Sequence, residues 1–183
     1  MMRSSKEEAA LNRERVVKIA SEKFREYGYD GIGIAGLMKS SGLTNGAFYK
    51  QFTNKEALIA EATDYAFKSK IQGWSRPKNK NVEDPKKAIA QWYLNEKHIE
   101  HVELGCAIAA LAAEAPRHGS EVQTVFTKNI KAIVEAISQS LNQDGDGEAE
   151  AIKILATLVG ALVLARATDD KELSQRVVDA VRR

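Results

Sequence analysis

The chain has 183 residues, of which 44% are hydrophobic, and a formal net charge of +2, so it can bury a core in one domain or in two small ones. The single cysteine, Cys106, excludes an internal disulfide framework, and the polar, charged first residues differ from an export signal, so we expect a cytoplasmic protein. The most apolar run, 151–165, contains Lys153 and is shorter than the roughly 20 residues that cross a bilayer, which argues against a membrane protein.

Positive charge is concentrated near the N-terminus. Residues 1–55 contain ten Lys and Arg against six Asp and Glu, a net +4, which leaves −2 for the remainder. Residues 39–55 contain three lysines and no acid. A local basic face on a nearly neutral protein is typical of a polyanion-binding site, although a solvated lysine face leaves the same pattern. The spacing of the other residues has to distinguish these two interpretations.

The first 55 residues are predicted to form three helices joined by short turns. Apolar residues recur at three- and four-residue intervals over 13–28, 34–41 and 44–52, which is typical of amphipathic helices. Gly28 is expected to end the first helix, and Gly42 lies in the turn before the third. Three short helices with a glycine in the last turn form the helix-turn-helix pattern.

The third predicted helix has an apolar side and a polar side. Phe48 and Phe52 are one turn apart, so we expect both to face the core, with Tyr49 at the border. The outer side is expected to carry short polar, small and basic residues, namely Thr44, Asn45, Ala47, Lys50 and Gln51.

A fourth helix is predicted to start at a capping box and to run to about residue 72. Thr53 would be the N-cap residue and Glu56 its partner three residues later, with Phe52 and Ala57 as a hydrophobic staple. Beyond a connecting loop, Asp84 followed by a proline favours the start of another helix. We expect an all-α protein of about nine helices, the later ones lying over 85–99, 106–115, 121–141, 148–167 and 170–183.

The segment "GYDGIGIAGLMKSSGLTNGAFYKQFTNKEAL" resembles the helix-turn-helix of TetR-family transcriptional repressors. The resemblance covers about residues 13–60 and implies a DNA-binding domain over 1–55, followed by a larger helical ligand-binding and dimerisation domain over 56–183. The matching motif residues are Gly28-Tyr29, Gly42-Leu43-Thr44, then Gly46, Phe48, Tyr49 and Phe52, and finally Lys55, Glu56 and Leu58.

The resemblance also implies roles in DNA binding. Asn45 has the amide that pairs with adenine, and Lys50 reaches guanine or a phosphate, while Tyr49 and Lys55 are implied as phosphate clamps. One departure is at the second helix, where Gly33 follows Ile32 instead of the Ser or Thr that family members often have. The full set of expected DNA contacts is Thr44, Asn45, Gly46, Ala47, Tyr49, Lys50, Gln51 and Lys55.

The implied partners are a palindromic DNA operator, a second copy of the chain and a small-molecule inducer, so the protein would be nucleoid-associated when bound to DNA. No cofactor is expected. The inducer pocket is expected among aromatic and small apolar residues, namely Phe67, Trp92, Tyr93, Cys106, Leu111, Phe126 and Ile130. The homodimer interface is expected on the last two helices, at Ile154, Leu158, Leu162, Ala165, Val177, Val178 and Val181.

Several alternatives remain open at this stage. Cys106 follows a glycine at a predicted helix start, so the repressor could instead sense oxidants or electrophiles through this thiol. A small-molecule carrier or an enzyme is a remote alternative, because no nucleophile with a base and no carboxylate pair is evident. A non-specific DNA binder would carry more positive charge after residue 55. His98 and His101 lie one turn apart, but without a second pair of ligands they do not predict a metal site.

Overall fold

The computed structural model describes residues 5–75, 82–141 and 147–183, and every regular element in these ranges is helical, which confirms the all-α prediction. Two short 3₁₀ helices, η2 and η3, accompany the α-helices. The elements are α1 (Ser5–Tyr27), α2 (Ile34–Ser40), α3 (Asn45–Phe48), α4 (Lys55–Lys68), α5 (Ile71–Trp74), α6 (Pro85–Tyr93), α7 (Glu96–Glu100), η2 (Val102–Leu104), α8 (Ala107–Leu111), η3 (Ala115–Arg117), α9 (Ser120–Ser140), α10 (Gly147–Ala167) and α11 (Lys171–Arg182).

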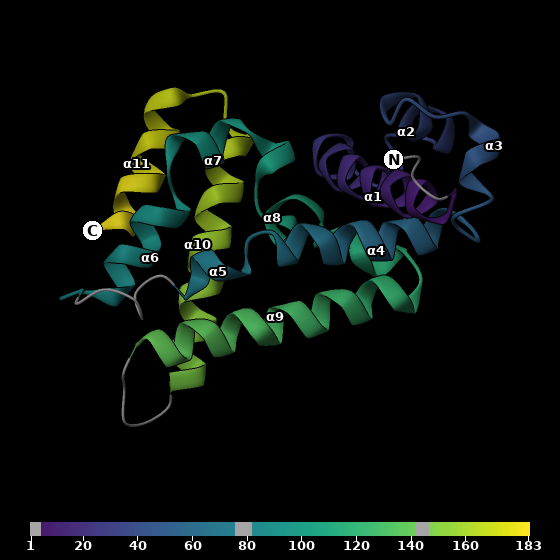
Figure 1. Ribbon diagram of the computed structural model, residues 1–183. Helices are drawn as coiled ribbons and strands as arrows, with labels where there is room; N and C mark the ends of the chain where they lie inside the picture. The colour runs from purple at the N-terminus through teal and green to yellow at the C-terminus, as the bar shows by residue number, and fades with distance from the viewer. Residues whose placement is uncertain (1–4, 76–81, 142–146) are drawn as a thin grey trace.

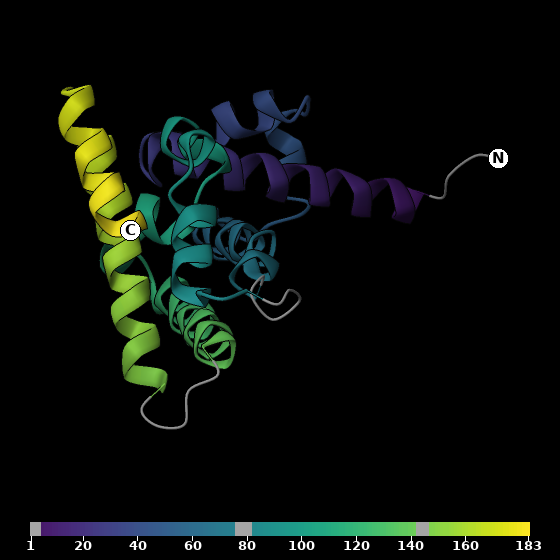
Figure 2. The same cartoon turned by 90° about the vertical axis from the view of Figure 1, so that its left-hand side faces the viewer.

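The helices form two groups connected by α4. In Figure 1, α1, α2 and α3 lie together at one end of the molecule, whereas α6, α10 and α11 lie at the other end. Helix α4 runs between these groups and packs against α1 on one side and α9 on the other. Figure 2 shows α10 and α11, which pack against each other, along one edge of the molecule. None of the described helices combines the length and the low charge that a membrane span requires.

The unit formed by α1, α2 and α3 has its own small core, to which α4 contributes. The chain leaves α1 through Gly28 at φ 78°, and it turns between α2 and α3 through Gly42 at φ 69°, where other residues would be strained. Both glycines therefore confirm the predicted turns. The buried core residues of this unit are Val16, Val17, Ala20, Phe24, Leu37, Met38, Phe48, Phe52, Leu58 and Ile59.

The predicted cap of the fourth helix is wrong by one residue. Asn54, not Thr53, is the N-cap residue of α4, and its Oδ1 accepts a hydrogen bond of 2.8 Å from the amide of Ala57. The Glu56 side chain does not return to the N-cap as a capping box requires. It binds His118 and Gly119 at the start of α9 instead, so a tertiary contact replaces the expected local one.

Two additional short helices arise where predicted helices are interrupted. Asp84 caps α6 as expected, with its Oδ1 accepting from the Lys87 amide at 3.0 Å. The helix ends at Tyr93, however, because Asn95 caps a separate helix, α7, by accepting from the His98 amide. Helix α5 likewise follows a break after α4. Both interruptions bring polar side chains to one internal cavity, described below.

The residues predicted for the dimer interface differ in exposure within the single chain. Leu158, Leu162, Ala165 and Val178 are buried. Ile154, Val177 and Val181 are half-buried and pack against the same core, so part of each stays at the surface. The four buried side chains offer little surface to a second copy. The exposed apolar residues of α10 and α11 are different ones, Ile152, Val163, Leu164 and Leu173.

Candidate nucleic-acid interface and adjoining cavity

A short polar surface lies on and beside α3. Thr44, Asn45, Gly46 and Lys50 are exposed, and Tyr49 is 69% exposed. The helix is only one turn long, shorter than the predicted 44–52, although the amide of Phe52 continues the turn by donating to the Phe48 carbonyl at 2.9 Å. No acidic side chain occurs between residues 39 and 55. This surface can therefore approach a polyanion without charge repulsion.

The apolar side of α3 fixes that surface to the α1–α3 unit. Phe48 is fully buried, and its ring stacks on Phe52 with the centroids 5.4 Å apart. Arg13 of α1 lies 4.2 Å from the centre of the Phe52 ring, donates to the Gln51 carbonyl and pairs with Glu61. No spacing in the sequence predicts this anchor, since Arg13 is 38 and 48 residues from its two hydrogen-bond partners.

Three of the residues expected to contact DNA are less open than the others. Ala47 and Gln51 are half-buried, and the Oε1 atom of Gln51 is buried without a hydrogen-bond partner. Lys55 is half-buried, and its ammonium lies 3.8 Å from the Asp30 carboxylate. Gly33 is the N-cap of α2 in an extended conformation and makes no side-chain cap, as expected for that position. The open part of the surface is therefore residues 44–46, 49 and 50.

A group of polar contacts joins the α1–α3 unit to the rest of the protein. Nδ1 of His118 lies 2.9 Å from the Glu56 carboxylate, whose other oxygen accepts from the Gly119 amide at 3.3 Å. Burial alone would raise the pKa of Glu56, but the hydrogen bonds from His118 and Gly119 outweigh it and hold that pKa below its ordinary value. The first turn of α4 is thus tied to the segment that begins α9.

Tyr29 makes a second connection at the same place. Its amide donates to Glu114 at 2.8 Å, its hydroxyl lies 2.8 Å from that of Thr63, and its ring packs edge-on against His118. Burial raises the pKa of this fully buried tyrosine, so its hydroxyl stays protonated. The segment 114–119 therefore contacts both the residue that follows the end of α1 and the start of α4.

A cavity of about 450 Å³ lies beside the C-terminal end of α4. It is lined by residues of α4, α5, α6, α7 and the segment leading into α8, with one residue from α9. Both tryptophans of the chain line it, and their rings are 5.2 Å apart. The lining residues are Ala66, Phe67, Lys70, Trp74, Trp92, Asn95, Lys97, His98, His101, Leu104, Cys106, Ala107 and Ile133.

Cys106 and His98 form a hydrogen-bonded wall of the cavity. The Cys106 amide donates to Nε2 of His98 at 2.9 Å, so Nδ1 carries the imidazole proton and donates to the Tyr93 carbonyl at 2.5 Å. Burial lowers the pKa of His98 to about 4, and the nearby charges of Arg166 and Lys70 act in the same direction. His98 is therefore a neutral structural residue near pH 7.

The predicted pocket residues separate into two groups. Phe67, Trp92 and Cys106 line the cavity. Tyr93, Leu111 and Phe126 are buried elsewhere, and Ile130 is half-buried in the core. Sequence reasoning missed the polar part of the lining, Lys70, Asn95, Lys97, His98 and His101. In the sequence, His98 and His101 stand out only as possible metal ligands, and no group of three or more metal-binding side chains occurs among the described residues.

The α1–α3 unit presents a short polar helix without acidic residues, and this helix rests on the buried Phe48–Phe52 pair. This is the arrangement of a helix-turn-helix DNA-binding domain. Residues 16–62 match the family model of bacterial regulatory proteins of the tetR family. The chain is 28% identical to YxaF, an uncharacterised HTH-type transcriptional regulator of Bacillus subtilis, over 160 residues that form 83% of this chain and 81% of YxaF.

Solved structures show the same fold over nearly the whole chain. The reduced form of NemR from Escherichia coli, an HTH-type transcriptional repressor, superimposes with a TM-score of 0.77 at 20% identity, covering 93% of this chain and 94% of NemR. AibR, crystallised with isovaleryl coenzyme A and operator DNA, has a TM-score of 0.65 at 15% identity, covering 93% of this chain and 95% of AibR. Residues 16–62 are a TetR-family helix-turn-helix domain, and the chain as a whole has the fold of TetR-family transcriptional regulators.

Proposed function

We propose that this regulator is a homodimeric repressor that binds a palindromic operator in the cytoplasm and leaves it when a small molecule occupies the cavity. The observation that carries this proposal is the exposed, acid-free surface at residues 44–50, held rigidly by the buried Phe48. AibR, a structural neighbour, has been solved with both a small molecule and operator DNA, which supports the combination. The proposed domains are residues 1–55 for DNA binding and 56–183 for ligand binding and dimerisation.

The exposed residues divide into base-reading and phosphate-binding groups. Asn45 is exposed at the first position of α3, where residues enter the major groove, and an Asn amide pairs with adenine through two hydrogen bonds. Tyr49 and Lys50 follow the helix and lie at the side, where they would hold phosphates. Lys55, at the start of α4, would also bind a phosphate and would give up its 3.8 Å contact with the Asp30 carboxylate.

Dimerisation is proposed through the exposed face of α10 and α11. Ile152, Val163 and Leu164 are at least 41% exposed on α10, and Leu173 is 41% exposed on α11. Gly160 lies on the same side of α10, and a side chain added there would meet no other atom within 4 Å. Large apolar side chains beside a small residue allow close helix packing, so two copies of this pair can form a four-helix bundle. A twofold axis at this bundle requires a palindromic operator.

Induction is proposed to act through α4. Ala66 and Phe67 near the end of this helix line the cavity, whereas Glu56 at its start is bound to His118. A ligand that moves the end of α4 therefore changes the position of the α1–α3 unit, and with it the separation of the two reading surfaces in the dimer. A catalytic role is not proposed, because the lone pair on Nε2 of His98 is used by the Cys106 amide and is unavailable as a base for the thiol.

Selection of bound DNA from a random pool, followed by a footprint, tests the proposed function. We expect one discrete palindrome. Asn45→Ala should change the preferred base at one position of each half-site, at about 1–3 kcal/mol, whereas Lys55→Ala should weaken binding to all sequences and reduce the salt slope by about 1. Uniform coverage of DNA would contradict a repressor, and an unchanged preference in Asn45→Ala would contradict base reading by this residue.

A second candidate function, oxidant sensing, is favoured by the surroundings of Cys106. The thiol lines the cavity, and the guanidinium groups of the buried Arg25 and the half-buried Arg166 both interact with it electrostatically. In this step the thiol sulfur attacks a peroxide oxygen and breaks the O–O bond, which leaves a sulfenic acid and releases the other oxygen as water. Such oxidation would place a polar group on the cavity wall.

Treatment of the operator complex with hydrogen peroxide separates the two functions. If Cys106 is the sensor, peroxide should release the wild-type protein from DNA and leave Cys106→Ser bound, because serine cannot form a sulfenic acid. Fluorescence anisotropy of labelled operator reports release, and mass spectrometry reports the added oxygen. Equal release of both variants would eliminate the sensor function.

A further inference from the structure

The charged side chains that line the cavity are all positive. Two of its lining side chains, the exposed Lys70 and Lys97, are cationic, and no aspartate or glutamate is among the lining residues. His101 pairs with Glu103, but neither lysine forms a salt bridge within the described ranges. The charge of Lys70 is felt inside the cavity, where it acts on His98. The lining therefore carries positive charge without an acidic residue of its own.

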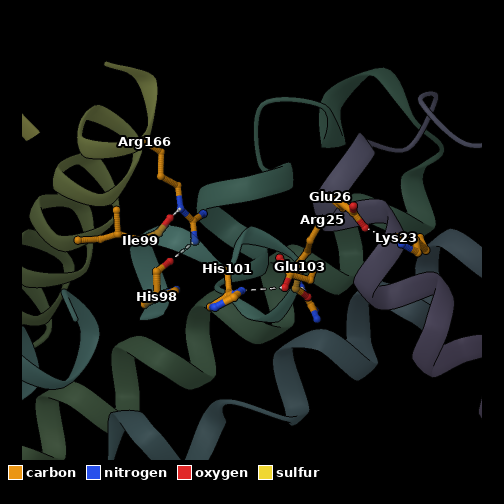
Figure 3. Close-up of polar contacts among 8 residues, drawn as sticks. All are labelled: Lys23, Arg25, Glu26, His98, Ile99, His101, Glu103 and Arg166. Atoms are coloured by element: carbon orange, nitrogen blue, oxygen red, sulfur yellow. Dashed lines mark hydrogen bonds and ion pairs between the residues drawn. The ribbon is translucent and has the colours of Figure 1, made fainter. Parts of the chain in front are cut away.

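Two arginines bind the backbone of the segment that lines the cavity, the buried Arg25 and the half-buried Arg166. Figure 3 shows Arg25 and Arg166 on opposite sides of the segment that carries His98, Ile99 and Glu103. Arg166 donates to the carbonyls of His98 and Ile99, and Arg25 donates from Nε to the Glu103 carbonyl at 2.7 Å. Among the described residues, neither guanidinium has a carboxylate partner within salt-bridge distance.

The lack of a carboxylate within salt-bridge distance is costly for the buried Arg25. Arg25 is only 6% exposed, and its Nη1 atom is buried without a hydrogen-bond partner. Burying a cation is costly unless an anion compensates it, and burial already lowers the pKa of both arginines. An anion bound in the cavity would supply negative charge near the arginines as well as to the lysines.

The remainder of the lining is apolar and aromatic. Phe67, Trp74, Trp92, Leu104 and Ile133 supply most of it. A volume of about 450 Å³ accommodates a small organic molecule, and an apolar cavity with a few polar groups at one side is typical of a ligand site. The ligand should therefore have an apolar body and a single negatively charged end.

We propose that the cavity binds an amphipathic organic monoanion, an aromatic or alkyl carboxylate, with its apolar body between the tryptophans and its carboxylate toward Lys70 and Lys97. This inference rests on the proposed function, because it identifies the chemical class of the inducer. A carboxylate in this position also attracts Arg25, which belongs to α1. Binding would then act on the DNA-binding unit directly as well as through α4.

Intrinsic fluorescence provides a site-specific test, because both tryptophans of the chain line this cavity. The probes are 4-butylbenzoate, its neutral amide 4-butylbenzamide and the cation 4-butylbenzylamine, which share one apolar body. We expect the benzoate to change the fluorescence with a Kd at least about tenfold below that of the amide, because a charge-assisted contact is stronger than a neutral one. The amine should give no saturable change.

Variants test the two lysines. The double variant Lys70→Gln/Lys97→Gln should raise the Kd for the benzoate about tenfold while leaving the Kd for the amide unchanged, as expected for loss of a charge-assisted contact. Lys131→Gln, an exposed lysine on α9 outside the cavity, is the matched control and should have no effect. Equal binding of the benzoate and the amide, tighter binding of the amine, or no saturable binding of any probe would overturn the proposal.

Release of the protein from its operator by each probe distinguishes the proposed ligand class from the proposed induction. Benzoate that binds with the expected preference but leaves the operator complex intact would support the ligand class and contradict release by a cavity ligand. Release by the amide at the same concentration as the benzoate would support release and contradict the anionic class. Release by the benzoate alone, lost in the lysine double variant, would support both.

Discussion

Phe48→Ala is expected to unfold the α1–α3 unit and abolish operator binding, whereas Tyr49→Ala is expected to weaken operator binding in a protein of normal stability. The two residues are neighbours in the chain with opposite environments. Phe48 is fully buried against Phe52, and loss of a buried phenylalanine side chain lowers the free energy of unfolding by about 3–5 kcal/mol. Tyr49 is 69% exposed, so its removal should change that free energy by less than about 0.5 kcal/mol.

Urea unfolding followed by circular dichroism measures the first effect, and fluorescence anisotropy with the selected operator measures the second. The Tyr49→Ala protein should bind the operator about tenfold more weakly, because one side-chain contact to a phosphate contributes about a factor of ten in affinity. Tyr49→Phe distinguishes the hydroxyl from the ring and should behave like the alanine variant. A Tyr49→Ala protein with normal operator affinity would remove this residue from the interface, and a Phe48→Ala protein of normal stability would contradict its placement in the core.

Local signals in the sequence predicted the fold well. Gly28 and Gly42 adopt the positive φ angles that only glycine takes without strain, and Asp84 caps α6. Each of these signals depends on neighbouring residues alone. The capping box failed because Asn54, one residue after Thr53, competes for the same role, and because Glu56 has a stronger partner in His118, 62 residues away. A long-range partner of this kind leaves no trace in local spacing.

The candidate sites were predicted less completely, for two physical reasons. Helix α10 has apolar residues on nearly all sides, so their spacing cannot indicate whether the face with Leu158 or the face with Leu164 is buried. The cavity is assembled from segments between residues 66 and 133, and its polar lining depends on interruptions at Ser69 and Leu94 that apolar periodicity did not reveal. By contrast, the surface around Asn45 lies on one short segment. The positions of Phe48 and Phe52 predicted their own burial and the exposure of Thr44, Asn45 and Lys50, although Ala47 and Gln51 are half-buried.

Leu164→Asp is expected to convert the homodimer into a folded monomer and to lower operator affinity by about 10²–10⁴, because two linked reading surfaces bind a palindrome far more tightly than one. Leu164 is 60% exposed in the single chain, so an aspartate there does not disturb the core. In the proposed four-helix bundle, the same aspartate would lie near its symmetry mate without a counter-charge. The cost of burying such a charge exceeds what a single apolar contact contributes.

Analytical ultracentrifugation measures the oligomeric state, and the selected operator and its half-site report DNA binding. The variant should bind the full palindrome no better than the half-site. Gln123→Asp adds the same charge to an exposed position of α9 and should remain a dimer. Leu158→Ala, on the buried face, should instead lose about 2–5 kcal/mol of unfolding free energy without a specific effect on association. A Leu164→Asp protein that sediments as a dimer would place the interface on another surface, and the proposed twofold axis with it.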